Sequence, residues 1–524
     1  MKQYCLAIVA SLILLSGVAF GQGGGQLTIA IRNADYDTLD PHVSAFTQSA
    51  YIFQNIFDRL IYLNSEGEYE PWLATSWTSN ADATSWVLVL RDDVTFQDGT
   101  AFDAAAVKFN LNRMTNPTTQ SKQAGPLMGP YSGSEVIDAH TLKVDFSEPN
   151  VLFPFSLSNP FMGMVSPTAV EAYGDRFTDH LVGSGPFKFV SEIRGNEIVL
   201  ARNDEYSWAP ASFHTGPAYL ERVVFRFVTE DVTRMATLET GESQIVDEIP
   251  PTQVQRMQAD PRFEVLGASK VGIARSLFFN TVLAPTNDLR VRQAISYAID
   301  RSALDQAVFR GVYPMATQIL TPGVRYYDTS LDNTYPFDPD KARSLLEEAG
   351  WTVVNQDGYR VKDGRVLSLY HATFEGFVAE APAEIIQAQL KDVGVRFDVN
   401  VMSGTAMMDG IAAKDSSINT ALVGTYSPDP GLILSRFFSS SGLGTVNYTH
   451  FATPELDALL NEGLSTTDDS RRAAIYHQIS QILMDNAVAV PLYANVSIFA
   501  TVSSIEGFKF DPFAHPQLFD IRYK

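Results

Sequence analysis

The spacing of apolar and polar residues predicts a strand-rich first half of the chain. Residues 27–31 form an apolar run typical of a buried strand, and residues 49–62 repeat apolar side chains at helical spacing. Residues 86–90 are apolar on both faces, as expected of a strand that is covered on both sides. Residues 135–230 contain further strand-like runs between clusters of Pro, Gly and Asn, so this part is predicted to form mixed sheet.

The second half of the chain alternates helices with strands. Asp338 and Pro339 supply an N-cap and a first-turn proline, and the helix that they begin is predicted to stop at Gly350. Residues 395–401 alternate apolar with polar side chains, which predicts a half-buried strand. Two blocks of different pattern predict two lobes, and a small-molecule site is expected in the cleft between them.

The first 21 residues predict a secretory signal peptide. Lys2 precedes an apolar run over residues 6–15, and small residues then lead to a predicted cleavage after about Gly21. This run is shorter than the about 20 apolar residues that a membrane span requires. The only cysteine, Cys5, lies inside the predicted signal and away from the cleavage point, so we expect an exported chain without a lipid anchor or disulfide bonds.

Charge and length narrow the possible functions. Loss of Lys2 with the signal peptide changes the formal net charge from −22 to −23. A negative field of this kind repels phosphate backbones, so we expect no nucleic-acid partner. A chain of 524 residues is too long for one hydrophobic core, and two or three domains are expected.

The chain carries few signatures of catalysis. It has no GxSxG, HExxH, P-loop or CxxC motif, and its histidines never fall at i, i+2 or i+4, so the sequence predicts no enzyme, cofactor or metal site. The stretch GSGP at 183–186 predicts a structural turn. Asp35, Asp37 and Asp40 lack the glycine of a calcium loop and indicate turn chemistry. A secreted hydrolase with paired carboxylates stays an alternative, because a sequence does not show separations in space.

A set of short motifs runs through nearly the whole mature chain. They are LDPH at 39–42, LATSW at 73–77, LRDDVTFQDG at 90–99, VGSGPF at 182–187, NDEYSW at 203–208, VRQAISYAIDR at 291–301, DPDKARSLLEEAG at 338–350 and QAQLKDVGV at 387–395. Together they resemble the motifs of family 5 of the extracellular solute-binding proteins, which serves peptide and nickel ABC importers. The match at 291–301 is the strongest of them.

This resemblance implies an α/β, two-lobed periplasmic-binding-protein fold of the Venus-flytrap type, with mixed sheets and an extra β-rich subdomain in lobe I. Hinge crossings are expected near residues 278–281 and 493–495. The expected boundaries are a signal peptide at 1–21, lobe I at 26–60, 185–278 and 494–524, its extra subdomain at 61–184, and lobe II at 279–493.

The resemblance also implies where ligand binds. Family members hold ligand between the lobes, and peptide-binding members commonly pair the α-ammonium of the peptide with the first aspartate of a D-Y-x-D-P motif. The matching stretch here is YSPDP at 426–430, so Tyr426 stands at the ammonium-binding position. A phenol is uncharged at neutral pH, and a buried unpaired ammonium is costly, which argues against ordinary peptide binding.

We expect Tyr426 and its neighbour Thr425 to contact ligand, although a tyrosine packed in the core explains the first position equally well. Asp429 is either a substitute partner for an ammonium group or a helix cap. The segment from His371 to residue 375, including Phe374, is expected to be a loop facing the cleft, with His371 more typical of a surface histidine than of a metal ligand.

In lobe I, Phe46 and Thr47 lead into a helix N-terminus that suits polar ligand groups. The chain is therefore interpreted as a periplasmic solute-binding protein, expected to be a monomer, that closes around a small solute or peptide and delivers it to the permease subunits of an ABC importer in the inner membrane. A nickel-chelate or oligosaccharide receptor of the same fold is the alternative among binding proteins.

Overall fold

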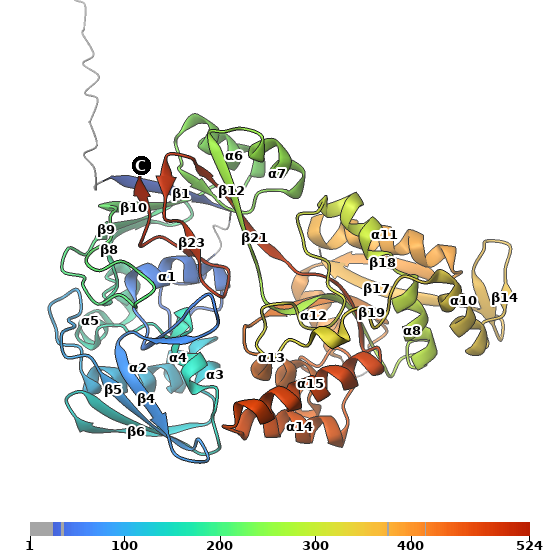
Figure 1. Ribbon diagram of the computed structural model, residues 1–524, viewed down its shortest axis with the longest axis horizontal. Coiled ribbons are helices and arrows are strands. Elements are labelled where there is room, and N and C mark those ends of the chain that lie inside the picture. The colour runs from blue at the N-terminus through green and yellow to red at the C-terminus, as the bar shows by residue number, and fades with distance from the viewer. Residues whose placement is uncertain (1–24, 33–35, 375–376, 414–415) are drawn as a thin grey trace, which may run out of the picture.

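Two lobes lie side by side and are joined by two long strands that run from one lobe toward the other (Figure 1). The computed structural model describes residues 25–32, 36–374, 377–413 and 416–524. The predicted signal peptide and its cleavage point lie outside these residues. The mixed helices and sheets of the two lobes match the predicted fold class.

Lobe I is built on a seven-stranded mixed sheet. β1 pairs in parallel with β10 on one side and with β11 on the other, and β21 from the C-terminal part of the chain runs antiparallel to β11 and β12. The strands, in sheet order, are β12 (Phe263–Ser269), β21 (Val496–Val502), β11 (Ile245–Val246), β1 (Gln26–Ile31), β10 (Arg222–Phe227), β9 (Glu197–Arg202) and β8 (Phe187–Ile193).

A separate four-stranded antiparallel sheet lies within lobe I, in the region predicted as an extra subdomain. Its strands, in sheet order, are β4 (Ala74–Ser79), β5 (Ser85–Leu90), β7 (Thr141–Phe146) and β6 (Tyr131–Asp138). Residues of this sheet and of the seven-stranded sheet belong to one continuous apolar core, which includes Leu88, Leu142, Ile29 and Phe225. The extra sheet therefore extends lobe I and shares its core.

Lobe II is built on a five-stranded sheet. The strands, in sheet order, are β18 (Arg396–Met402), β17 (Ser368–Phe374), β19 (Thr420–Tyr426), β13 (Gly272–Phe279) and β20 (Ala489–Tyr493). β17 runs parallel to β18 and β19, while β13 runs antiparallel to β19 and β20. The carboxyl ends of β17, β18 and β19 therefore lie at one edge of this sheet.

The place where the chain first crosses between lobes differs from the expectation. A boundary after residue 278 assigns β13 to lobe I, but this strand pairs with β19 and β20 of lobe II. The crossing instead lies at Lys270 and Val271, between β12 and β13. The return crossing lies at Ala494 and Asn495, and the backbone N–H of Lys270 donates to the carbonyl oxygen of Asn495 at 2.7 Å, so the two crossings are paired.

Helices cover both sheets. In lobe I they are α1 (Ala50–Ile56), α2 (Ala104–Thr115), α3 (Ala124–Met128), α4 (Phe153–Leu157), α5 (Pro167–Tyr173), α6 (Asp231–Thr240) and α7 (Pro251–Gln258). In lobe II they are α8 (Leu289–Ala298), α9 (Arg301–Leu304), α10 (Pro339–Glu348), α11 (Phe377–Asp392), α12 (Gly404–Ala412), α13 (Pro430–Phe438), α14 (Pro454–Ser465) and α15 (Asp469–Asp485). Short strand pairs complete the fold: β2 (Ile61–Leu63) with β3 (Tyr69–Pro71), β14 (Val353–Val354) with β15 (Arg360–Lys362) and β16 (Arg365–Val366), β22 (Ile505–Glu506) with β25 (Arg522–Tyr523), and β23 (Lys509–Phe510) with β24 (Pro516–Gln517).

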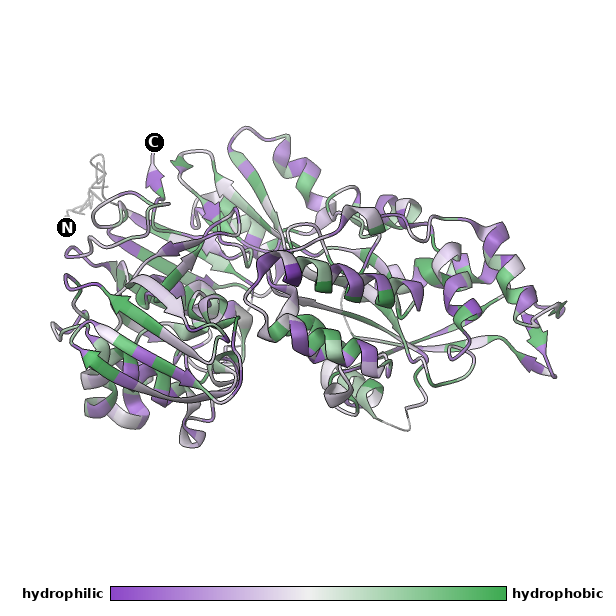
Figure 2. Ribbon diagram, turned by 60° about the horizontal axis from the view of Figure 1, so that its bottom comes forward, coloured by the Kyte–Doolittle hydropathy of each residue, from purple (hydrophilic) through white to green (hydrophobic). Residues whose placement is uncertain are grey.

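Capping side chains start several of these helices, and Asp338 does so where the sequence predicts. The carboxylate of Asp338 accepts from the backbone N–H of Lys341 at 2.9 Å, and Thr453 caps α14 in the same way. Helices in both lobes carry hydrophilic as well as hydrophobic residues (Figure 2). No helix in the described ranges combines the length and apolarity needed to cross a membrane.

The turn at residues 183–186 is structural, as predicted. A Cβ added at Gly183 would lie 2.1 Å from the carbonyl oxygen of Ile56, so only glycine fits this close approach. The hydroxyl of Ser184 is buried and donates to Asp58 at 3.1 Å. This serine therefore anchors a turn onto α1 and is not an exposed nucleophile.

Candidate functional site between the lobes

Two cavities lie between the lobes and meet at Lys270. The first, here called the cleft cavity, has a volume of about 1190 Å³, part of it open to solvent. Lobe I lines it with Gln48 and Tyr51, and lobe II lines it with Tyr426 and Arg436 of the segment from β19 to α13. Because both lobes contribute side chains, occupation of this cavity is coupled to the distance between the lobes.

Tyr426 and Thr425 both line the cleft cavity, where the end of β19 reaches it. The Tyr426 hydroxyl accepts hydrogen bonds from Arg275 Nη2 at 3.3 Å and from the Asn495 side-chain amide. Lys270 Nζ lies 5.4 Å from the centroid of the Tyr426 ring. Two cations thus approach Tyr426, one at its hydroxyl and one at its ring.

Arg275 is a half-buried cation that faces phenols. Burial alone would lower the pKa of its guanidinium, but the nearby phenols of Tyr426 and Tyr493 raise that pKa above its usual value. Its guanidinium carbon also lies 5.6 Å from the ring centroid of Phe374. Within the described part of the chain, the recorded contacts of the Arg275 guanidinium are with the Tyr426 hydroxyl and the Phe374 ring, and no ion pair with a carboxylate is found there.

The cleft cavity is basic and aromatic. Lys270 and Arg436 line it, and no acidic side chain does so among the residues that the structure describes. Its rings come from both lobes: Tyr51, Phe155, Phe161, Tyr426, Phe437 and Phe513. Such a cavity favours a ligand with negative charge and with apolar surface that can pack on rings.

The second cavity, here called the hinge cavity, has a volume of about 1060 Å³, part of it open to solvent, and lies against the two lobe crossings. Lobe I contributes Arg32, Asp231 and Glu248, which follow the carboxyl ends of three neighbouring parallel strands, β1, β10 and β11. Lys270 and Asn495 come from the crossings, and Tyr313 comes from lobe II. Ligands of open α/β sheets commonly bind at this edge.

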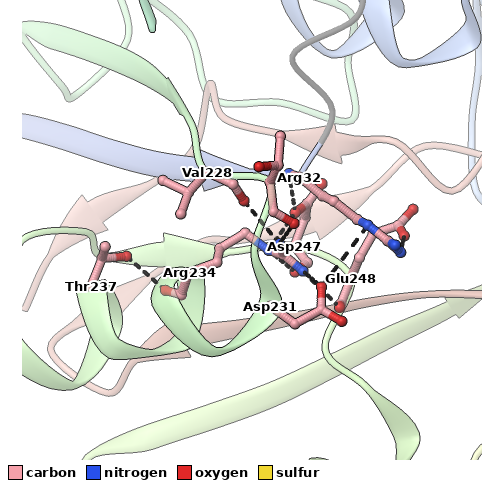
Figure 3. A network of polar contacts seen from close by, with 8 residues as sticks. Arg32, Val228, Asp231, Arg234, Thr237, Asp247 and Glu248 are labelled. Carbon is pink, nitrogen blue, oxygen red and sulfur yellow. Dashed lines mark hydrogen bonds and ion pairs between the residues drawn. The ribbon is translucent and has the colours of Figure 1, made fainter. Parts of the chain in front are cut away.

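Arg234 of α6 holds these strand ends together through contacts with Asp231, Asp247 and Glu248 (Figure 3). It is fully buried and donates to the carbonyl oxygens of Val228, Asp247 and Glu248, as well as to the Asp231 carboxylate at 2.8 Å. Its Nε lies 3.3 Å from the Asp247 carboxylate. One guanidinium therefore fixes the ends of β10 and β11 and the start of α6 relative to one another.

Charges alternate in sign along the hinge cavity. Arg32 Nη1 lies 3.3 Å from Glu248, and Arg32 Nε lies 3.9 Å from Asp231. Asp247 lies buried beneath them, where burial and then the negative charge of Glu248 raise its pKa to about 7, against the opposing effect of Arg234. Glu248 itself adopts a left-handed backbone with φ of 47°, which is unusual for a residue with a side chain.

Asp429 lies beside the cleft cavity in a structural role. Its carboxylate accepts from the backbone N–H of Gly431 at 2.8 Å and so caps α13. It also pairs with Arg472 of α15 at 3.4 Å, and only 3% of its side chain is exposed. The alternative reading of this residue as a helix cap is therefore the correct one, because both carboxylate oxygens already have partners.

The expectation of a ligand-facing loop at residues 371–375 is wrong for its described part. Residues 368–374 form strand β17, and His371 is 1% exposed, with its ring stacked on Phe397 at a centroid distance of 4.7 Å. Burial lowers the pKa of His371 to about 3, so it is neutral in the fold and is not a surface histidine. Phe374 lies at the strand end, half-buried under Arg275.

The two lobe I candidates lie at the edge of the site. Phe46 is 39% exposed, and Thr47 begins the short 3₁₀ helix Thr47–Ser49 that precedes α1. Their neighbour Gln48 lines the cleft cavity. The predicted segment thus lies next to the cleft cavity, and Gln48 is the residue beside it that lines this cavity.

Sequence reasoning missed the charged residues of both cavities. Arg275 stands in the mainly apolar strand β13, which is a usable signal for a functional cation. Lys270 and Asn495 mark the lobe crossings, and Glu248 follows a strand of only two residues. No group of three His, Cys, Asp or Glu side chains suited to a metal ion occurs in the described ranges.

Comparison with known proteins places the chain in a family. Residues 68–445 match the profile described as "Bacterial extracellular solute-binding proteins, family 5 Middle". The chain belongs to this family. Family 5 proteins are solute-binding components of ABC importers, so the chain is an extracytoplasmic solute-binding protein of the peptide-transport type. This confirms the resemblance seen in the motifs.

Individual relatives agree over nearly the full length. The chain is 28% identical to the glutathione-binding protein GsiB of Escherichia coli O1:K1 / APEC over 511 residues, which are 96% of this chain and 95% of that protein. Its fold is similar to that of NikA from Brucella suis in complex with Fe(III)-EDTA, with a TM-score of 0.85 and 24% identity over 95% of this chain and all (100%) of that one. HbpA2 from Haemophilus parasuis is also similar, with a TM-score of 0.82 and 23% identity over 95% and 100% of the two chains.

Proposed function

We propose that this family 5 protein captures a small peptide-like solute with at least two carboxylates, of which glutathione is the leading example. The observation that carries the proposal is the charge of the cleft cavity, which has Lys270 and Arg436 on its wall and no acidic residue among its described lining. Arg275 adds a third cation behind Tyr426. A ligand carboxylate would compensate charges that the described protein residues leave unpaired.

Glutathione meets these requirements chemically. It carries two carboxylates and one ammonium at neutral pH, and its size suits a cavity shared by two lobes. The proteins named as glutathione-binding are similar to this chain over almost its whole length. Tyr426 in place of an acid also favours a ligand whose negative groups, and not its ammonium, face the end of β19.

The cellular setting follows from this function as a proposal. We propose that the chain acts in the periplasm after cleavage near Gly21, without a lipid anchor, and passes its solute unchanged to permease subunits in the inner membrane. We further propose that it binds as a monomer, since the two lobes of one chain supply the described lining of both cavities.

Ligand-dependent thermal unfolding tests the proposed ligand class. The mature chain is heated with glutathione, with glutathione whose carboxylates are amidated, with Ni(L-His) and with an oligosaccharide mixture. A ligand at 100-fold its Kd adds about 2.7 kcal/mol to the free energy of unfolding, so Tm is expected to rise with glutathione and not with the amidated form. Mass spectrometry of the released solute is expected to recover it unchanged.

A rise in Tm with Ni(L-His) or with oligosaccharide alone would replace this proposal by the corresponding receptor. An equal rise in Tm with glutathione and with its amidated form would show that the cations of the cleft cavity do not recognise the carboxylates of the ligand. A hydrolysed product in the mass spectrum would contradict the proposal of a carrier without turnover.

A further inference from the structure

The hinge cavity has a charge pattern that the cleft cavity lacks. Four charged side chains line it, with Arg32 and Lys270 positive and Asp231 and Glu248 negative. This balance does not favour a net anion. It complements a ligand end that carries both charges on groups attached to one carbon, as the free amino and carboxyl groups of an α-amino acid are.

Hydrogen bonds to the backbone fix the position of Glu248 at the hinge cavity. Its left-handed backbone turns the chain sharply after β11, and Arg234 holds the carbonyl oxygens of Asp247 and Glu248 at 3.0 and 3.2 Å. Backbone conformations of this kind persist where the surrounding structure imposes them, often at ligand-binding positions. The Glu248 side chain itself is 40% exposed, so its carboxylate is open to a partner from the cavity.

Asn495 lines the same cavity and carries an unused acceptor atom that is closed to solvent. Its amide nitrogen donates to the Tyr426 hydroxyl, which fixes the amide orientation. Its Oδ1 is buried and accepts no hydrogen bond within the described part of the chain. An unpaired buried acceptor lowers stability until a donor reaches it, and a ligand ammonium offers three donors.

We infer that the free amino group of the solute binds Glu248 and Asn495 in the hinge cavity, and that Arg32 binds the carboxylate on the same carbon. The inference rests on the proposed function, because it places the amino-acid end of a γ-glutamyl peptide here and its distal carboxylate beside Arg436 in the cleft cavity. On binding, the carboxylate and the ammonium of the solute replace Glu248 and Arg32 as each other's ion-pair partners. The Arg32–Glu248 pair is exposed and therefore contributes little by itself. Recognition of the ammonium is thereby moved from lobe II, where Tyr426 stands, to lobe I.

Calorimetric titration with two peptides tests this assignment. The probes are glutathione and its deamino analogue, in which hydrogen replaces the amino group, and the proteins are wild type, Glu248→Gln and a control. Wild type is expected to prefer glutathione by about 10- to 100-fold, the usual range for a hydrogen-bonded charged pair. Glu248→Gln is expected to lose this preference while its affinity for the deamino analogue stays unchanged.

Glu242→Gln is the matched control, since Glu242 is an exposed acid of lobe I, 63% exposed and outside both cavities. It is expected to keep the wild-type preference. Arg32→Met provides a second variant, expected to weaken glutathione more than a decarboxy analogue that lacks the carboxylate on the same carbon.

The outcomes separate the two proposals. If Glu248→Gln keeps the full preference for glutathione, or loses affinity for both peptides equally, the placement of the amino group is overturned and the proposed function stands. If wild type binds neither peptide, both are overturned. Loss of preference in Glu248→Gln but not in Glu242→Gln supports the assignment.

Discussion

The hinge cavity and the cleft cavity share Lys270 but obtain their charges in different ways. The acids and Arg32 of the hinge cavity lie at strand ends that one buried guanidinium holds in place. The cations of the cleft cavity come from a lobe crossing and from α13, on separate elements. The comparison indicates a charge-balanced end whose acids are held in place by shared hydrogen bonds, and a basic end whose cations lie on separate elements and favour carboxylates.

The largest expected effect tests the rigidity of the hinge cavity. Arg234→Ala removes the donors to Val228, Asp247 and Glu248 and leaves the buried Asp247 without its cation. Breaking a buried ion pair from one side costs about 3–5 kcal/mol, so the urea midpoint should fall with little change in slope.

Arg226→Ala is the control for this variant, because the 3.9 Å pair of Arg226 with Glu242 is exposed. Such a pair contributes about 0–1 kcal/mol. Equal losses of unfolding free energy in the two variants would contradict the view that Arg234 fixes the backbone that carries Glu248.

The pH dependence of stability gives the next effect. Burial and Glu248 raise the pKa of Asp247 to about 7, whereas an aspartate in an unfolded chain titrates near about 4. Between these values the native state keeps a proton that the unfolded state has lost, so the contribution of Asp247 is complete below about pH 4 and declines as the pH rises through about 7.

Asp247→Asn removes this titration while keeping a similar side-chain shape. Relative to wild type, the variant should therefore be more stable at pH 8 than at pH 5, measured as the difference in free energy of unfolding at each pH. Parallel curves for the two proteins would mean that Asp247 stays ionised across the range and that its ion pair with Arg234 dominates.

The basic end is tested through binding. Lys270→Met removes a cation that lines both cavities, and glutathione affinity is expected to fall by about 10- to 100-fold, the range of a charge-assisted hydrogen bond. The loss should shrink as salt is added, since screening already weakens the wild-type interaction. Lys391→Met, at an exposed position in the last turn of α11, should bind as wild type does.

Local chemistry made much of the fold predictable. Asp338 and Pro339 mark the start of α10, and the motifs along the chain indicate the two-lobed family. The crossing at Lys270 could not be placed, because β13 is an apolar strand that would fit either sheet. The burial of His371 could not be predicted, because its ring lies on the covered face of β17 and packs on Phe397 of the neighbouring strand.

The site was predictable only where it is local in sequence. Thr425 and Tyr426 line the cleft cavity as expected of a motif with a known position. The hinge cavity joins Arg32, Asp231, Glu248 and Asn495, which are separated by long stretches of chain and meet only through strand pairing. No pattern along one sequence reveals such a meeting.

The smallest effect concerns Tyr426. Tyr426→Phe removes the hydroxyl that accepts from Arg275 and Asn495 but keeps the ring beside Lys270. Two donors lose one shared acceptor, so the free energy of unfolding should fall by about 1 kcal/mol. The cations remain in place, and glutathione affinity should therefore change by less than about 5-fold, a difference of about 1 kcal/mol. Tyr173→Phe, at an exposed position outside both cavities, should change neither quantity. A large loss of affinity in Tyr426→Phe would mean that the phenol itself binds the solute. The solute would then make a polar, uncharged contact between the charge-balanced hinge cavity and the basic cleft cavity.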